Sequence, residues 1–316
     1  RKGFIIIRHI PDFEIYRKKV FLLWHKFLNS SDDILINYRS KSAKYYLGYS
    51  DTPFVTDDGV KHLNFNSFVA RPISNTVKSN KYKDFEEGFK NIWPDDYLPE
   101  FKSSFQNLGK IVSTCQFHLF DHVCVYLKDL IPNFQNDIQT DLSKNIDVVS
   151  RLINYYPRKV VEKNILDGWH TDYSLFTAIT HPMFLENSKK IDFNQTCLKI
   201  LDRSMNEVEL VMNENDLLIF PSNSFHILSG GIISATPHVV ELNRQKSNEF
   251  NCNRVTLATF FQPNPDYIMK LPSNVNSKEN IKFTPHMNEF FENNISYQEY
   301  SDFLLNYLIT RKEQKI

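Results

Sequence analysis

The chain has 316 residues, of which 41% are hydrophobic and 23% charged, and its 37 basic and 37 acidic residues give a formal net charge of zero. These values are ordinary for a globular protein and lack the basic excess of a dedicated nucleic-acid-binding protein, so we expect no nucleic-acid partner. No apolar run approaches the roughly 18 residues that a membrane span requires, so we expect no membrane segment.

Four cysteines are spread along the chain without a C-x-x-C pair. This spacing offers neither a zinc ribbon nor a thioredoxin motif, and it favours reduced, mostly buried thiols in a reducing compartment. We therefore expect a cytoplasmic protein, and we expect it to be a monomer. The sequence starts at Arg1 without a Met, so its targeting is left open.

The amino-terminal half reads mainly as helices. Residues 3–8 form an apolar run that predicts a strand, and residues 11–29 place apolar side chains at helical spacing. Residues 38–95 are irregular and contain turn residues, which predicts loops and short elements. A long amphipathic helix is expected over residues 98–130, with an apolar stripe formed by Phe101, Phe105, Leu108, Val112, Cys115, Leu119, Val123 and Tyr126.

Two histidines of this long helix, His118 and His122, are four residues apart and share one helical face. A zinc pair would need further ligands, and the H-E-x-x-H pattern of zinc enzymes is missing. Helix-surface or packing histidines are the better interpretation.

After residue 150 the sequence changes to short β-branched and aromatic runs separated by turns, and residues 290–310 close the chain with a helical pattern. Many short strands at regular spacing predict a mainly β fold with flanking helices, a jelly roll or double-stranded β-helix. We expect a single domain, with a mostly helical flank (1–149), a jelly-roll core (150–265) and a carboxy-terminal helical flank (266–316). The predicted strands are 151–156, 176–180, 197–201, 208–212, 216–220, 227–228, 238–242 and 254–262.

The segment Trp169 to Tyr173 carries the most chemistry. At a strand end, residues i and i+2 point to the same side, so His170 and Asp172 can converge on one ion. One imidazole and one carboxylate make up two members of the facial triad that holds non-haem Fe(II) and leaves positions open for other ligands.

The third ligand should be a histidine on another strand. His238 opens an apolar run after a glycine pair and is the preferred candidate. His226 lies beside Ser224 and Phe225 in an expected turn, and His181 precedes a proline, so structural roles are favoured for both.

Arg254 and Thr256 are candidates for binding an acidic co-substrate. At i and i+2 of one strand, a guanidinium and a hydroxyl share a face, and the planar guanidinium suits a carboxylate. A surface arginine is the alternative interpretation, and Arg244 is an alternative anchor, although no strand follows it directly.

Several segments together resemble the isopenicillin N synthase-like branch of the Fe(II)/2-oxoglutarate oxygenases. The N-Y-Y-P run at 154–157 resembles the segment before the first iron ligand, and residues 170–177 resemble the pattern H-T-D-x-x-x-L-T, with Phe in place of Leu. D-L-L-I at 216–219 and L-S-G-G at 228–231 resemble a later strand and turn, and residues 3–10 resemble the family's opening. The resemblance spans nearly the whole chain.

The resemblance implies that His170, Asp172 and His238 bind Fe(II). It also implies that Arg254 and Thr256 hold the distal carboxylate of 2-oxoglutarate, that Tyr156 assists, and that Asn154 lies near the other carboxylate. Oxidation of a small-molecule substrate by O2 would then form succinate and CO2, with ascorbate as a possible reductant. Thr256 replaces the family's usual Ser, and the interval from His238 to Arg254 is longer than usual.

Two alternatives differ in what they predict. An isopenicillin N synthase-like or ascorbate-dependent oxidase would not use 2-oxoglutarate, so it would form no succinate. A catalytically silent jelly-roll binding protein would not hold stoichiometric iron.

Overall fold

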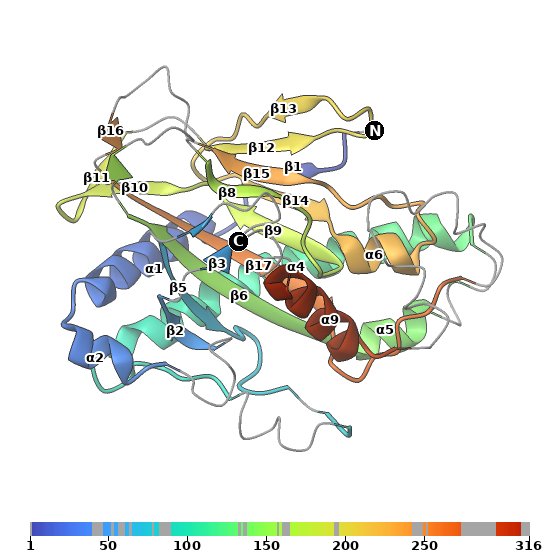
Figure 1. Ribbon diagram of the computed structural model, residues 1–316, viewed down its shortest axis with the longest axis horizontal. Helices are drawn as coiled ribbons and strands as arrows, with labels where there is room; N and C mark the ends of the chain where they lie inside the picture. Colours follow the sequence, from blue (N-terminus) through green and yellow to red (C-terminus); the bar gives the residue numbers. More distant parts are fainter. Residues whose placement is uncertain are drawn as a thin grey trace.

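The structure is a computed structural model of the chain, shown in Figure 1. It describes residues 2–39, 47–51, 54–55, 61–62, 65–77, 79–81, 90–131, 134, 138–156, 158–159, 165–192, 196–241, 249–250, 252–272 and 295–310. The helices of this part are α1 (Phe13–Leu28), α2 (Asp32–Ile36), α4 (Pro99–Lys128), α5 (Thr140–Lys144), α6 (Asn223–Leu228) and α9 (Tyr297–Thr310).

The larger of two main sheets has nine antiparallel strands. Its central path runs β1 (Ile5–Ile7), β14 (Leu217–Pro221), β9 (Phe176–Thr180), β17 (Asn253–Pro263), β6 (Ile146–Tyr155), β5 (Phe65–Ala70) and β2 (Gly48–Ser50). The hairpin of β10 (Met183–Glu186) and β11 (Lys189–Ile191) joins it through β17. The flank before residue 150 therefore supplies strands to this sheet as well as helices.

The smaller main sheet has four strands in the order β13 (Glu207–Glu209), β12 (Leu198–Leu201), β15 (His238–Glu241) and β8 (Ile165–His170). Two further pairs are formed by β7 (Arg158–Lys159) with β16 (Glu249–Phe250), and by β3 (Phe54–Val55) with β4 (Lys61–His62). The chain is thus mainly antiparallel β with helices, as expected.

Two hydrophobic clusters show how the layers pack. One joins residues of α1 and α4 to the large sheet, with Trp24, Phe101 and Phe261 among its buried members. The other joins both main sheets through side chains such as Phe220 and Ile200. Because neighbouring strand residues point to opposite faces, each strand of the large sheet contributes alternately to the helical layer and to the space between the sheets.

The long helix α4 follows the expected apolar stripe only in its first half. The first four members of the stripe are buried as predicted, but Tyr126 is 57% exposed; the four are Phe101, Phe105, Leu108 and Val112. The buried face continues instead through Gln116, Phe120, Cys124 and Leu127. A shift of one residue turns the face by about 100°. Cys115, Leu119 and Val123 of the predicted stripe are therefore only partly buried, and Tyr126 is exposed.

The predicted elements agree with the structure where their pattern was long. The two long helices are confirmed, and the strand expected at 176–180 coincides with β9. The strand expected at 227–228 is wrong, because these residues belong to the buried helix α6. The strand end expected at His170 is the end of β8, whereas β5 and the hairpin of β10 and β11 were not predicted. Residues 290–294 of the expected last helix lie outside the described residues.

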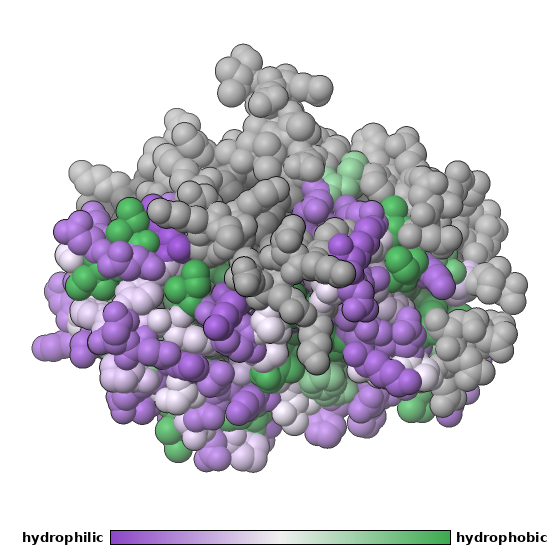
Figure 2. Space-filling model, turned by 90° about the horizontal axis from the view of Figure 1, so that it is seen from below, coloured by the Kyte–Doolittle hydropathy of each residue, from purple (hydrophilic) through white to green (hydrophobic). Residues whose placement is uncertain are grey.

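The four cysteines are unpaired, and three of them are buried. On the face shown in Figure 2, hydrophilic residues alternate with hydrophobic residues that lie singly or in small groups. None of the described helices combines the length and the apolar character that crossing a bilayer requires.

Candidate metal centre

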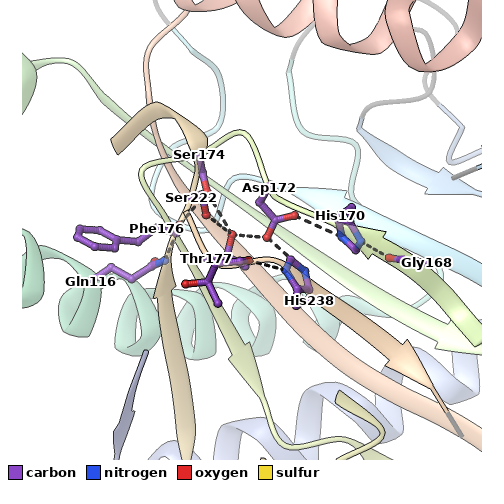
Figure 3. A network of polar contacts seen from close by, with 10 residues as sticks. Gln116, Gly168, His170, Asp172, Ser174, Phe176, Thr177, Ser222 and His238 are labelled. Carbon is purple, nitrogen blue, oxygen red and sulfur yellow. Dashed lines mark hydrogen bonds and ion pairs between the residues drawn. The ribbon is translucent and has the colours of Figure 1, made fainter. Parts of the chain in front are cut away.

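Two neighbouring strands of the small sheet bring His170 and His238 together. His170 is the last residue of β8, His238 is the first residue of β15, and the two residues are direct partners in the antiparallel pair. Asp172 follows two residues after His170 and turns back to the same side of the sheet (Figure 3). The expected convergence is therefore a consequence of the β8–β15 register.

The three side chains form a compact group. His170 Nε2 lies 3.7 Å from one carboxylate oxygen of Asp172, and His238 Nε2 lies 3.8 Å from the other. The centres of the two imidazole rings are 4.2 Å apart. Each residue offers one ligand atom that lies within 4.8 Å of the ligand atoms of the other two. The described residues contain no other group of three possible metal ligands that is this compact.

Backbone carbonyls orient both imidazoles. The Nδ1 atom of His170 lies 2.6 Å from the carbonyl oxygen of Gly168, and that of His238 lies 3.2 Å from the carbonyl oxygen of Thr236. Because a carbonyl oxygen only accepts hydrogen bonds, each Nδ1 carries the hydrogen and each Nε2 keeps a lone pair. This arrangement of an outer hydrogen bond behind a ligating nitrogen is typical of metal-binding histidines.

The carboxylate of Asp172 is held by a hydroxyl network (Figure 3). Thr177 Oγ1 donates to Asp172 Oδ2 over 2.5 Å, and it lies 3.1 Å from Ser222 Oγ and 3.2 Å from Ser174 Oγ. The first residues of α6 also fix the backbone here, since the amide of Asn223 donates to the carbonyl oxygen of Asp172. The loop carrying Asp172 is therefore tied to both β9 and α6.

Arg254 and Thr256 lie on β17, on the face directed toward the small sheet. Arg254 is buried, its Nη2 donates to the carbonyl oxygen of Thr196 over 2.9 Å, and its Nε and Nη1 have no hydrogen-bond partner. Within the described residues no carboxylate forms an ion pair with this guanidinium. Thr256 Oγ1 donates to the carbonyl oxygen of Thr180. A buried cation with free donors can receive an anion.

The structure does not bring Asn154 or Tyr156 to Arg254. Asn154 pairs with Val255 and therefore points to the opposite face of the sheet, where its amide donates to Asn253. The half-buried Tyr156 lies on the other side, and burial with nearby Asp51 and Asp32 raises its pKa to about 12. Roles of these two residues in binding 2-oxoglutarate therefore stay predictions from the resemblance.

The tyrosine that accompanies Arg254 is Tyr155. It is the direct partner of Arg254 in the β6–β17 pair, and the guanidinium carbon lies 5.4 Å from the centre of its ring. The sequence could not show which of the two adjacent tyrosines lies beside Arg254, because that depends on the strand register. Thr177 is the last residue of the segment 170–177 that resembles the family pattern, and the sequence assigns it no role.

The competing histidines lie elsewhere. His226 is buried in α6 and its Nδ1 donates to the carbonyl oxygen of Ile233. His181 is buried after β9, where burial and the charge of Arg17 lower its pKa to about 4. His118 and His122 are exposed on α4. The alternative anchor Arg244 lies outside the described residues.

The sequence matches no protein-family profile and no curated protein. The fold matches solved structures, among them a protein from Caulobacter crescentus assigned to the 2OG-Fe(II) oxygenase family. That match has a TM-score of 0.72 at 17% identity and covers 98% of this chain and 90% of that one.

Two further matches were solved with bound ligands. A full-length protein of Neurospora crassa, in complex with alpha-KG and thymine, matches with a TM-score of 0.64 at 17% identity, covering 100% of this chain and 88% of that one. JOX2, in complex with 2OG, Fe and JA, matches with a TM-score of 0.62 at 16% identity, covering 96% and 77%. The chain thus shares the overall fold of these oxygenases.

Proposed function

We propose that this chain is an Fe(II)- and 2-oxoglutarate-dependent dioxygenase of the isopenicillin N synthase-like branch, built on a double-stranded β-helix. The observation that carries the proposal is the convergence of His170, Asp172 and His238 within 4.8 Å on adjacent strands. The likeness in fold to oxygenases solved with alpha-KG or with 2OG and Fe supports it. Residues 150–265 would form the jelly-roll core of one catalytic domain.

The donor set fits a ferrous ion. Two neutral imidazole nitrogens and one carboxylate are the ligands of the facial triad, and a hydrogen bond at each Nδ1 leaves a lone pair on Nε2. His238 is 3% exposed, so water reaches it poorly from that side. When bound, Fe(II) would supply the redox chemistry with O2, while 2-oxoglutarate supplies two electrons and leaves as succinate and CO2.

The surroundings of Arg254 fit the distal carboxylate of 2-oxoglutarate. Two buried guanidinium nitrogens, Nε and Nη1, lack hydrogen-bond partners. They lie on different edges of the planar group, so a carboxylate would accept a charge-assisted hydrogen bond from one of them. The Thr256 hydroxyl lies two residues along the same face, and its single hydrogen would have to turn from the carbonyl oxygen of Thr180 to reach the carboxylate. The ring of Tyr155 covers the guanidinium and keeps water from it. Asn154 and Tyr156 have no part in this proposal.

The substrate class we propose is a small organic molecule. Solved structures of similar fold hold thymine, 5-formyluracil and JA, which are all of that class. The residues of this chain would orient such a molecule at the triad, exclude water from the space between the sheets and hold the co-substrate at Arg254. An oxidase that does not use 2-oxoglutarate is the second candidate, and it would release no succinate.

The test is anaerobic titration of the purified chain with Fe(II) and 2-oxoglutarate, followed by visible absorption. We expect the metal-to-ligand charge-transfer band of the chelate, and we expect its loss in His170→Ala and in Asp172→Ala. His118→Ala, which replaces an exposed histidine of α4, is the matched control and should keep the band. A band that survives in both ligand variants would refute the proposal, and succinate formation separates it from the oxidase alternative.

A further inference from the structure

We infer that Thr177 is a positioning residue that keeps Asp172 bound to the metal through a single oxygen atom. The inference rests on the proposed function, because it concerns the same triad. Thr177 belongs to the sequence segment that resembles the family pattern, but it is neither a proposed metal ligand nor a proposed contact of the co-substrate.

Thr177 approaches the triad from the other sheet. It lies on β9 of the large sheet, is fully buried, and pairs with Phe220 on β14, whose ring centre lies 4.7 Å from that of His238. Its Oγ1 is 2.5 Å from Asp172 Oδ2. This short contact has the length expected of a hydroxyl that donates to a carboxylate.

The direction of each proton in the network follows from the groups themselves. A carboxylate only accepts, so the single hydroxyl hydrogen of Thr177 is directed to Asp172. Ser174 Oγ donates to the carbonyl oxygen of Phe176 over 3.0 Å. Because the only hydroxyl hydrogen of Thr177 is already directed to Asp172, Ser222 is the donor in its 3.1 Å contact with Thr177. The resulting chain runs from Ser222 through Thr177 to Asp172, and each donor strengthens the next.

Occupation of Oδ2 decides how many positions remain open on the metal. A bidentate carboxylate would take a fourth position of an octahedral ion, leaving two open positions instead of three. The co-substrate needs two positions when it binds through its keto oxygen and one carboxylate, and oxygen needs another. With Oδ2 held by Thr177, Oδ1 would be the oxygen left for a metal ion, and three positions would stay open.

The structure also explains why the restraint is rigid. Thr177, Ser174 and Ser222 are all 1% exposed or less, so water cannot easily replace a missing hydroxyl. The amide of Ser222 donates to the carbonyl oxygen of Leu175, which fixes the start of α6 against the loop that carries Asp172. Removal of the Thr177 hydroxyl would therefore leave Oδ2 without this donor and able to turn to a bound metal ion.

The number of water molecules on bound Mn(II) tests the inference, because Mn(II) accepts oxygen and nitrogen ligands and is stable in air. The experiment measures water-proton relaxation of the full chain saturated with Mn(II), with the dissociation constant determined in parallel. In Thr177→Val, which keeps the shape without the hydroxyl, we expect the inner-sphere relaxation per bound ion to fall by about one third, from three waters to two. Thr177→Ser should restore the wild-type value.

Thr259→Val is the matched control, because Thr259 is a buried threonine whose hydroxyl contacts Ser150, away from the metal. It should keep the wild-type relaxation. Wild-type relaxation in Thr177→Val would overturn the inference while the proposed function stands. A wild-type chain that binds no Mn(II) and no Fe(II) would overturn both. If Thr177→Val does not fold by circular dichroism, Thr177→Ala replaces it with the same expected loss.

Discussion

The guanidinium of Arg254 lies against the ring of Tyr155, with 5.4 Å between the guanidinium carbon and the ring centre. Arg254 is 2% exposed, and two of its nitrogens have no hydrogen-bond partner. A buried cation is costly unless an anion or several acceptors compensate it. The pairing with a tyrosine in place of a carboxylate leaves Arg254 available for a carboxylate that arrives with a ligand.

Arg254→Gln should therefore weaken 2-oxoglutarate binding without preventing folding. Loss of charge-assisted hydrogen bonds worth about 1.5–3 kcal/mol predicts a rise in the KM for 2-oxoglutarate of roughly ten- to a hundredfold. Steady-state kinetics with varied 2-oxoglutarate measures it. Arg203→Gln, which replaces an exposed arginine, is the control. A KM within twofold of the parent would show that the carboxylate binds elsewhere.

Substitution of the two adjacent tyrosines should show which of them, Tyr155 or Tyr156, affects the binding of 2-oxoglutarate. Tyr155→Leu removes the ring beneath Arg254, and a cation–π contact of about 0.5–2 kcal/mol predicts a several-fold loss of 2-oxoglutarate affinity. Tyr155→Phe keeps the ring and should bind almost normally. Tyr156→Leu should have a smaller effect than Tyr155→Leu, because Tyr156 lies near Asp51 and Asp32. Calorimetric titration of each variant with 2-oxoglutarate measures these affinities. A larger loss of affinity in Tyr156→Leu than in Tyr155→Leu would support the role that the resemblance implies for Tyr156.

A buried ion pair at the start of β6 should matter for stability. Arg71 Nε lies 2.9 and 3.1 Å from the two carboxylate oxygens of Asp147, and both residues are 5% exposed. Arg71→Met leaves the Asp147 charge buried and uncompensated, so we expect a loss of about 3–5 kcal/mol in the free energy of unfolding. Urea denaturation measures it.

The double variant Arg71→Met, Asp147→Leu is the control for this pair. Because it removes both charges, it should recover much of the lost stability. If it is as unstable as Arg71→Met alone, the cost arises from packing and not from the stranded charge.

His181 should make the fold less stable in mild acid. Burial, with Arg17 and Arg254 nearby and Glu214 opposing them, lowers its pKa from 6.5 to about 4. The unfolded chain therefore binds this proton at a higher pH than the folded chain does. The free energy of unfolding has its full value with respect to His181 above pH 6.5. It falls by about 3 kcal/mol at most as the pH is lowered toward 4. Denaturation at several pH values measures it.

His181→Asn tests this dependence, because the asparagine amide can keep the hydrogen bond that Nδ1 makes to the carbonyl oxygen of Pro182. The slope of stability against pH between 6.5 and 4 should become shallower in this variant. His118→Asn, on the exposed face of α4, should keep the parental slope. An unchanged slope in His181→Asn would mean that His181 is protonated in the folded chain over this range.

The triad could be predicted from the sequence because two of its three residues lie close together along the chain. His170 and Asp172 are two residues apart, which by strand alternation places them on one side, and His238 opens the next suitable apolar run. By contrast, the choice between Tyr155 and Tyr156 depends on the register of β6 against β17, which no local pattern encodes. The helix at Asn223–Leu228 was missed because all of its residues are buried, so it has no polar face to show a helical period.

The two ends of the proposed site belong to different sheets. His170 and His238 are carried by the four-stranded sheet, whereas Arg254 is carried by the nine-stranded sheet. A molecule bound at both the triad and Arg254 would therefore connect the two sheets and fix the distance between them. Ile200 is the cross-strand partner of His238 and Phe184 that of Arg254, so a substitution at either position would act on one end of the site.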